Sequence, residues 1–360
     1  MDSVQSAAVK KTEEKLKPKL FSVMKGYKKE QLVKDIISGI IVAIIALPLS
    51  IALALASGVA PEQGLYTAIV AGFVVSFLGG SRVQIAGPTA AFATIVAGIV
   101  ATEGMDGLII STILAGIFLV IMGFCRFGSL IKYIPTTITL GFTFGIAVTI
   151  VVGQIKDFCG MTFEGSPVET MEKVEEIFKS LSTFNPLAFL IGLISLAILI
   201  LWPKKLSKIP PSLIAVIVGA VIVKVSGMNV NTIGDLYQIS SAPPKFTFPE
   251  FTFERVKALI PNAFTIAILA AIESLLSCVV ADGMIGSKHR SNMELTAQGA
   301  ANIASALFGG IPATGAIART AANIKNGGRT PIAGMVHAVV LLIVLVVLLP
   351  YAAMIPMPTI

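Results

Sequence analysis

The sequence predicts an all-α, polytopic membrane protein, and both its composition and its apolar runs lead to this class. Of the 360 residues, 55% are hydrophobic and only 13% are charged, and the mean hydropathy is +0.89. Soluble domains carry about 25% charged residues, so this chain has too few polar side chains to cover itself in water. Apolar runs of about 20 residues, long enough to cross a bilayer as a helix, recur along the chain. Runs such as 337–350 do not alternate as transmembrane β-strands do.

The apolar runs divide into eleven predicted spans, separated by glycine, proline and polar residues. A basic, amphipathic segment, 10–34, precedes the first span and is too polar for a signal peptide. The predicted spans are 36–56, 62–80, 88–101, 107–125, 135–153, 185–202, 210–226, 260–281, 294–308, 312–323 and 331–350. The last residues, 351–360, are again apolar, and we expect them to begin a twelfth span that is truncated here.

The lysines and arginines orient these spans. With the N-terminus in the cytoplasm, most of the 27 basic residues fall on the inner side, as the positive-inside rule favours. Most of the 20 acidic residues then fall on the outer side, above all in the connection 154–183. Removing any one span would mix the two sets, so the charges support the count of eleven. The expected location is the plasma (inner) membrane, with a cytoplasmic N-terminus.

The composition gives no sign of a metal, a cofactor or an enzyme. The three cysteines, Cys125, Cys159 and Cys278, are scattered and, with only two histidines, show no metal-ligand spacing. The net charge of +7 is spread over the inner side of the spans, so nucleic acid is not an expected partner. Glu273 is the only carboxylate predicted at membrane depth, so no cluster of acid, base and nucleophile is expected there.

Two of the predicted spans are too short to cross the bilayer. The segments 88–101 and 312–323 correspond to about 21 and 18 Å of helix, against a hydrocarbon core of about 30 Å. Each begins at a proline, which suits a first helical turn because its missing N–H would be unpaired there. Pro48 and Glu273 interrupt apolar spans about 40 residues before these prolines, in spans that run in opposite directions. Paired interrupted segments in two inverted halves indicate a secondary transporter with its site near the midplane.

The N-termini of two such short helices would form an anion site in the membrane. Each end presents free N–H groups and about half a unit of positive charge, which favours anion binding. Threonine hydroxyls would add donors, and small neighbours would let a ligand reach the backbone. The predicted substrate-binding residues at these ends are Pro88, Thr89, Ala90, Ala313, Thr314, Gly315 and Ala316. Arg319 lies two turns after the second proline and could either reach back to the anion or anchor the helix at the inner surface.

Glu273 has two open interpretations. An ionisable side chain inside a span is usually functional, and burial disfavours the charged carboxylate, so Glu273 is the predicted coupling site for a proton that accompanies the anion. Ser277, one turn further on the same face, is the predicted neighbouring ligand. The alternative is structural, with a buried acid that stays neutral or pairs with a nearby base.

Two long segments of the chain resemble the SulP family of anion permeases, which includes sulfate, bicarbonate and dicarboxylate transporters. They are 35–92, with its LP…GLY and GPTA motifs, and 270–334, with ESLLS…VAD and GGIPATGAIART. The resemblance implies two inverted seven-span repeats, in which a core domain moves against a gate domain as an elevator. Short strands precede the half-helices in that fold, near Val83–Ala86 and Gly309–Ile311 here.

The same resemblance divides the chain and gives roles to single residues. The implied parts are a cytosolic segment (1–34), core (35–127), gate (128–226), an extracytoplasmic loop (227–259), core (260–350) and the start of a gate span (351–360). Family members usually continue into further gate spans and a cytosolic STAS domain, and tend to form homodimers. A glutamate at position 273 goes with proton coupling and an aspartate with sodium coupling, while Arg319 adds positive field. Leu49, with Leu53 nearby, stands where the family often has a polar substrate-site residue.

The predicted function is secondary active transport, as proton-coupled symport of a small inorganic or dicarboxylate anion resembling sulfate. Sodium-coupled bicarbonate transport and uncoupled exchange or channel activity are the alternatives. A membrane scaffold that transports nothing is disfavoured, because paired broken helices would have no purpose in it. The expected partners are the anion, a coupling proton or sodium ion, the lipid bilayer and a second copy of the full-length chain.

Overall fold

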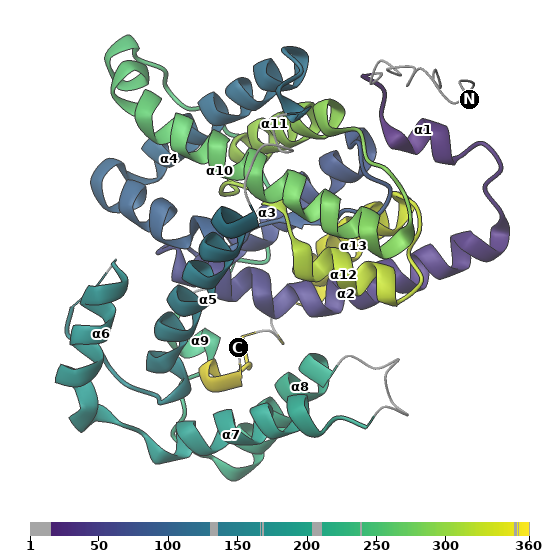
Figure 1. Ribbon diagram of the computed structural model, residues 1–360. Coiled ribbons are helices and arrows are strands. Elements are labelled where there is room, and N and C mark those ends of the chain that lie inside the picture. Colours follow the sequence, from purple (N-terminus) through teal and green to yellow (C-terminus); the bar gives the residue numbers. More distant parts are fainter. Residues whose placement is uncertain are drawn as a thin grey trace, which may run out of the picture.

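The structure, a computed structural model, describes residues 16–129, 136–165, 167, 169–203, 211–237, 240–348, 351 and 353–359. These residues are almost entirely helical, in agreement with the predicted all-α class. Figure 1 shows two groups of helices: α2–α4 with α10–α13, and α5–α9 below them. Three stretches of basic residues used for the orientation, 10–15, Lys132 and 204–208, lie outside the described residues.

The larger group contains α2 (Lys29–Ala56), α3 (Pro61–Leu78), α4 (Ala93–Phe124), α10 (Phe253–Ile285), α11 (Ser291–Leu307), α12 (Ile317–Lys325) and α13 (Ile332–Ile343), with the short α1 (Lys19–Val23) before them. The smaller group contains α5 (Thr136–Phe158), α6 (Thr170–Lys179), α7 (Pro186–Leu201), α8 (Pro211–Ser226) and α9 (Ile233–Leu236). By length and composition, four described helices can cross a membrane: α2, α3, α10, and α4 with its preceding turn. The bent pair of α6, with the turn Ser180–Thr183, and α7 would be a fifth.

Each of the eleven predicted spans overlaps a helix. α4 contains two of them, because it is a single element across a kink at Gly104. Gly104 has φ of 70°, a left-handed conformation that glycine adopts without steric strain. The predicted break between the third and fourth spans is therefore confirmed as a kink.

The prediction that both short helices begin at a proline is wrong. The first starts with a 3-10 turn at Ala90–Phe92, after an extended Thr89, so Pro88 precedes the helix. The second, α12, starts only at Ile317, five residues beyond Pro312. The chain stays extended there because Asn302 binds both backbone groups of Ala313, with each N···O distance 2.9 Å.

A two-stranded antiparallel sheet lies between the half-helices. β1 (Ala86–Gly87) pairs with β2 (Thr314–Gly315), with Ala86 opposite Gly315. Strands before the half-helices are thus present, but not where the resemblance implied them. β1 overlaps the implied segment Val83–Ala86 only at Ala86, and β2 lies after Gly309–Ile311, because the extended segment held by Asn302 carries the pairing.

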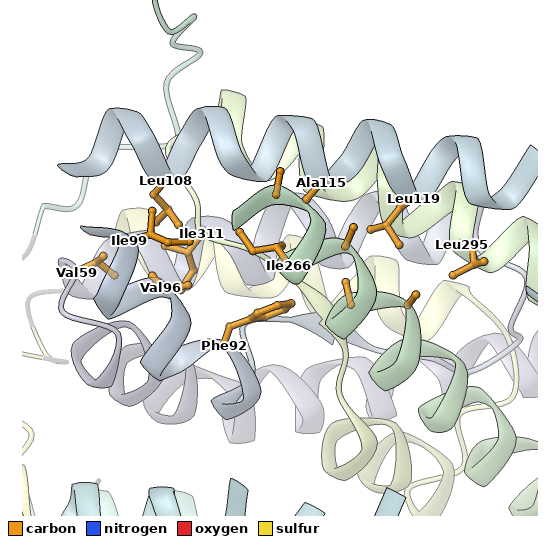
Figure 2. Packing of buried hydrophobic residues seen from close by; sticks show 14 of the residues in the cluster. Val59, Phe92, Val96, Ile99, Leu108, Ala115, Leu119, Ile266, Leu295 and Ile311 are labelled. Atoms are coloured by element: carbon orange, nitrogen blue, oxygen red, sulfur yellow. The ribbon is translucent and has the colours of Figure 1, made fainter. Parts of the chain in front are cut away.

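The main apolar cluster joins both parts of α4 to α10 and α11. Figure 2 shows Val96 and Ile99 before the kink, Leu108 and Leu119 after it, and Ile266 from α10 between them. Lipid is as apolar as these side chains, so association in a membrane depends on close packing.

Glycines allow α4 and α11 to approach most closely. A Cβ at Gly116 or at Gly299 would collide with the backbone of the other helix. This close packing of α11 on α4 positions Asn302, which bonds to Ala313 just before β2.

Candidate functional site

The start of the first half-helix is accessible on one side. Thr89 has extended φ and ψ of −133° and 157°, so it stands at the N-cap of the 3-10 turn. Its hydroxyl group donates to a carboxylate oxygen of Glu273 on α10, with an O···O distance of 2.8 Å. Ala90 and Ala91 line a cavity of about 570 Å³ between α4, α5 and α10. The first N–H groups of the helix therefore lie beside open space.

The start of the second half-helix is enclosed by protein. Ala313, Thr314 and Ala316 are buried. The Thr314 hydroxyl lies 2.7 Å from that of Ser274, which also accepts the N–H of Gly315 at 3.1 Å. The N–H of Ala316 donates to the carbonyl of Ile85 at 2.9 Å. The residues predicted at this end are together, but their polar groups are already bonded.

Arg319 joins the two starts. It is the largest fully buried side chain of the described residues, with 1% of its surface exposed. From α12 its Nη2 donates to the carbonyl oxygen of Pro88 at 2.9 Å. Nε and Nη1 have no partner in the described part of the chain. Of the two placements open from the sequence, the guanidinium takes the one that reaches back to the half-helix start, and its charge acts on Glu273.

The other predicted residues differ in their surroundings. Ser277 is buried on α10, and its hydroxyl has no partner among the described residues. On α2, Leu53 is buried whereas Leu49 is 38% exposed. Neither leucine contributes a polar group to the site.

Several polar residues around the site were not predicted from the sequence. Ser274 bonds to the second half-helix start, and Asn302 holds the strand before it. The sequence contained a signal for Asn302. One face of its apolar span carries polar residues at intervals of four, namely Glu294, Gln298 and Asn302.

The prediction that Glu273 is the only buried carboxylate is also wrong. Asp35 and Glu294 are fully buried in α2 and α11. Glu294 accepts the N–H groups of Gly80 and Ser81 at 2.8 and 3.1 Å, and is bonded to Gln298. Asp35 likewise accepts backbone N–H groups, those of Arg329 and Thr330. Both acids therefore have structural hydrogen-bond partners, and neither is hydrogen-bonded to Glu273 in the described part of the chain.

Two half-helices that meet at a strand pair, with a buried arginine and a carboxylate beside them, are typical of membrane transporters with broken helices. Residues 32–360 match the sulfate permease family, so the chain belongs to that family of membrane transporters. It is a multi-pass membrane protein.

Relatives and solved structures agree with this assignment. The chain is 46% identical over 335 residues to the putative sulfate transporter YvdB of Bacillus subtilis (strain 168), covering 92% of this chain and 63% of the relative. It is 33% identical to the bicarbonate transporter BicA of Picosynechococcus sp., covering 90% of this chain and 59% of the relative. The chain thus spans about three fifths of the length of these curated relatives.

Two solved structures have the same fold. The transmembrane domain of a cyanobacterial bicarbonate transporter BicA superposes with a TM-score of 0.81 at 29% identity, covering 92% of this chain and 86% of that one. Murine Slc26a9, an anion transporter in the inward-facing state, superposes with a TM-score of 0.84 at 21% identity, covering 100% and 63%. The predicted helical membrane fold is confirmed at this level.

Proposed function

We propose that the protein is a secondary active transporter of a small inorganic or dicarboxylate anion, bound between the starts of the two half-helices and accompanied by a proton on Glu273. The observation that carries the proposal is Arg319. A buried guanidinium with two unpartnered nitrogens lacks acceptors that burial normally requires. An anion at the start of α4 would supply them and would also meet the helix dipole.

Thr89 supplies a physical link between anion and proton. While Glu273 is ionised, the Thr89 hydroxyl donates a hydrogen bond to the carboxylate. The negative charge of the carboxylate also repels an anion nearby. A protonated Glu273 removes that charge and can itself donate to Thr89. The Thr89 hydroxyl can then donate a hydrogen bond to the anion instead, so protonation of Glu273 favours anion binding.

The proposed motion is an elevator movement of the larger helix group against the smaller one. The core would comprise 35–127 and 260–350, and the gate 128–226, in the inner membrane with a cytoplasmic N-terminus and as a homodimer. Support comes from the cavity beside Ala90, since it lies between core helices α4 and α10 and gate helix α5.

Sodium coupling is the second candidate. It is favoured by the buried Ser277 hydroxyl, which lacks a described partner one turn from Glu273, and by relatives named as bicarbonate transporters. Sulfate is the first candidate anion, because other relatives carry that name.

Uptake by the complete protein in proteoliposomes tests the proposal. Sulfate, bicarbonate, fumarate, succinate and chloride are offered with and without an inward proton gradient, and with and without sodium. We expect saturable uptake of at least one anion that an inward proton gradient accelerates. Uptake driven by sodium alone would move the assignment to the second candidate, and no uptake of any anion would overturn it.

A further inference from the structure

A second cavity, of about 430 Å³, lies at the ends of α2 and α5 that face outward in the proposed orientation, beside the first part of α4 before its kink. Ala97 of α4 is in its wall. Because Ala97 lies eight residues after Thr89, the two are about 12 Å apart along the helix. The cavity is thus about two turns further out than the helix-terminus site, and between the same core helix and gate helix.

Most of the charged side chains that line this cavity are basic. The connection 154–183 contains three lysines and six acids. Two of the lysines, Lys156 and Lys173, line the cavity, together with one acid, Asp157. The cavity is therefore the basic part of an otherwise acidic connection.

Three of the remaining five acids of the connection have partners elsewhere. Glu172 and Glu176 accept backbone N–H groups within the connection, at 3.1 Å for the shortest bond of each. Glu175 pairs with Lys179 at 2.7 Å, where both side chains are well exposed. None of these acids lines the cavity.

The two lining lysines are not neutralised. Neither has an ion-pair partner in the described part of the chain. Nζ of Lys156 lies 5.2 Å from the ring centroid of Phe163, which fixes the amine at the wall without removing its charge. Burial lowers the pKa of Lys173, in keeping with an amine in a confined space rather than in open solvent.

We propose that this cavity is an outer anion-binding site, in which Lys156 and Lys173 hold a small inorganic or carboxylate anion before it enters the helix-terminus site. The inference rests on the proposed transport function. Two amines that line one cleft raise the local anion concentration and the rate of capture. Asp157 opposes them, so the anion is held weakly and can move on.

Neutralising the lysines tests the site in the complete protein. Lys156→Gln with Lys173→Gln should raise the KM for ³⁵S-sulfate, and for ¹⁴C-bicarbonate, about three- to tenfold at low ionic strength, with Vmax within about twofold. About 0.1 M impermeant salt, with a Debye length of about 10 Å, should remove most of the difference. The change should appear only when the anion is presented on the outer side of oriented vesicles. Lys179→Gln is the matched control and should leave KM unchanged.

Asp157→Asn provides a test of opposite sign. It should lower the KM, a direction that misfolding would not produce, and arginine at positions 156 and 173 should restore the parent value. Equal KM values for the glutamine variants and the Lys179→Gln control, with the parent active, would overturn the outer site alone. An inactive parent that also fails to bind either probe would overturn the transport function itself.

Discussion

The two half-helices begin in different ways, although the chain enters each from a strand of the same small sheet. At the first start, the threonine before the helix donates to a carboxylate, and the two alanines after it line a cavity. At α12 the corresponding threonine is enclosed, and Ser274 and Asn302 hold the strand around it. One start is therefore suited to binding a ligand, whereas the other is a scaffold that delivers Arg319 to it.

The ends of the same two regions that face the cytoplasm in the proposed orientation (the inner ends) are alike. Asp35, before the first half-helix, accepts the N–H groups of Arg329 and Thr330 after the second, at 2.8 and 3.3 Å. Glu294, before the second half-helix, accepts those of two residues that precede the first. Each carboxylate thus accepts backbone N–H groups from a loop next to the other half-helix. The larger asymmetry is between the half-helix starts, where we place the anion.

The largest effect is expected at Arg319. Arg319→Ala should reduce anion uptake about 100-fold or more, because it removes both the charge and the bond to Pro88. Arg319→Lys should not restore uptake, since an ammonium lacks the planar set of donors. Binding of ³⁵S-sulfate to purified protein provides the measurement, and thermal unfolding shows whether the variant is folded.

Arg126→Ala is the control for this substitution, because that arginine is exposed between α4 and α5. It should behave as the parent does. A folded Arg319→Ala protein that binds sulfate with parent affinity would show that the two starts do not share an anion.

Glu273→Gln is expected to have the next largest effect. The amide cannot change charge, so an inward proton gradient should no longer accelerate uptake, and the gradient-driven rate should fall about tenfold or more. Uptake is measured at fixed inner pH while the outer pH is varied. Glu254→Gln, an exposed position at the start of the same helix, should keep the gradient response. Undiminished proton-driven uptake by Glu273→Gln would remove the coupling role.

The sequence predicted the helices much better than the way the half-helices begin. Apolar runs and glycines are local signals, so the spans and the kink at Gly104 could be found from them. The start of α12 depends on Asn302 and on pairing with β1, which is remote in the chain. A proline preceded by glycine is compatible with either a helix start or an extended strand, and only these non-local bonds decide between them.

The candidate site shows the same limit. Glu273 and the threonines were accessible to sequence reasoning because polar residues in apolar spans are conspicuous. The direction of Arg319 was not, since one position on α12 allows the side chain to reach either the inner surface or Pro88. The carboxylates Asp35 and Glu294 were missed because they stand at the ends of spans, where an acid is usually solvated.

A pair of threonine variants tests the contrast between the two starts directly. Thr89→Ala should weaken sulfate binding about three- to tenfold and leave thermal stability near the parent value, because its hydroxyl faces the site. Thr314→Ala should instead lower the free energy of unfolding by about 1 kcal/mol, since it removes a buried bond to Ser274. Affinity and thermal unfolding are measured on both proteins. The contrast fails if Thr314→Ala loses affinity without losing stability.

The smallest effect is expected at the inner end, where Asp35 has a donor that Glu294 lacks. The Tyr27 hydroxyl donates to Asp35 at 2.8 Å, and burial, followed by this bond, raises the pKa of Tyr27 to about 12. An unfolded tyrosine titrates near pH 10, so this contribution to stability is complete below about pH 10 and is lost as the pH rises to about 12. Tyr27→Phe should therefore flatten the decline of thermal stability over that alkaline range, and cost about 1 kcal/mol or less at pH 7. Tyr351→Phe, at an exposed tyrosine, should follow the parent curve. Coincident alkaline unfolding curves for the parent and Tyr27→Phe would show that the Tyr27 hydroxyl does not stabilise the protein through Asp35. The inner ends at Asp35 and Glu294 would then be alike in stability as well as in backbone bonding.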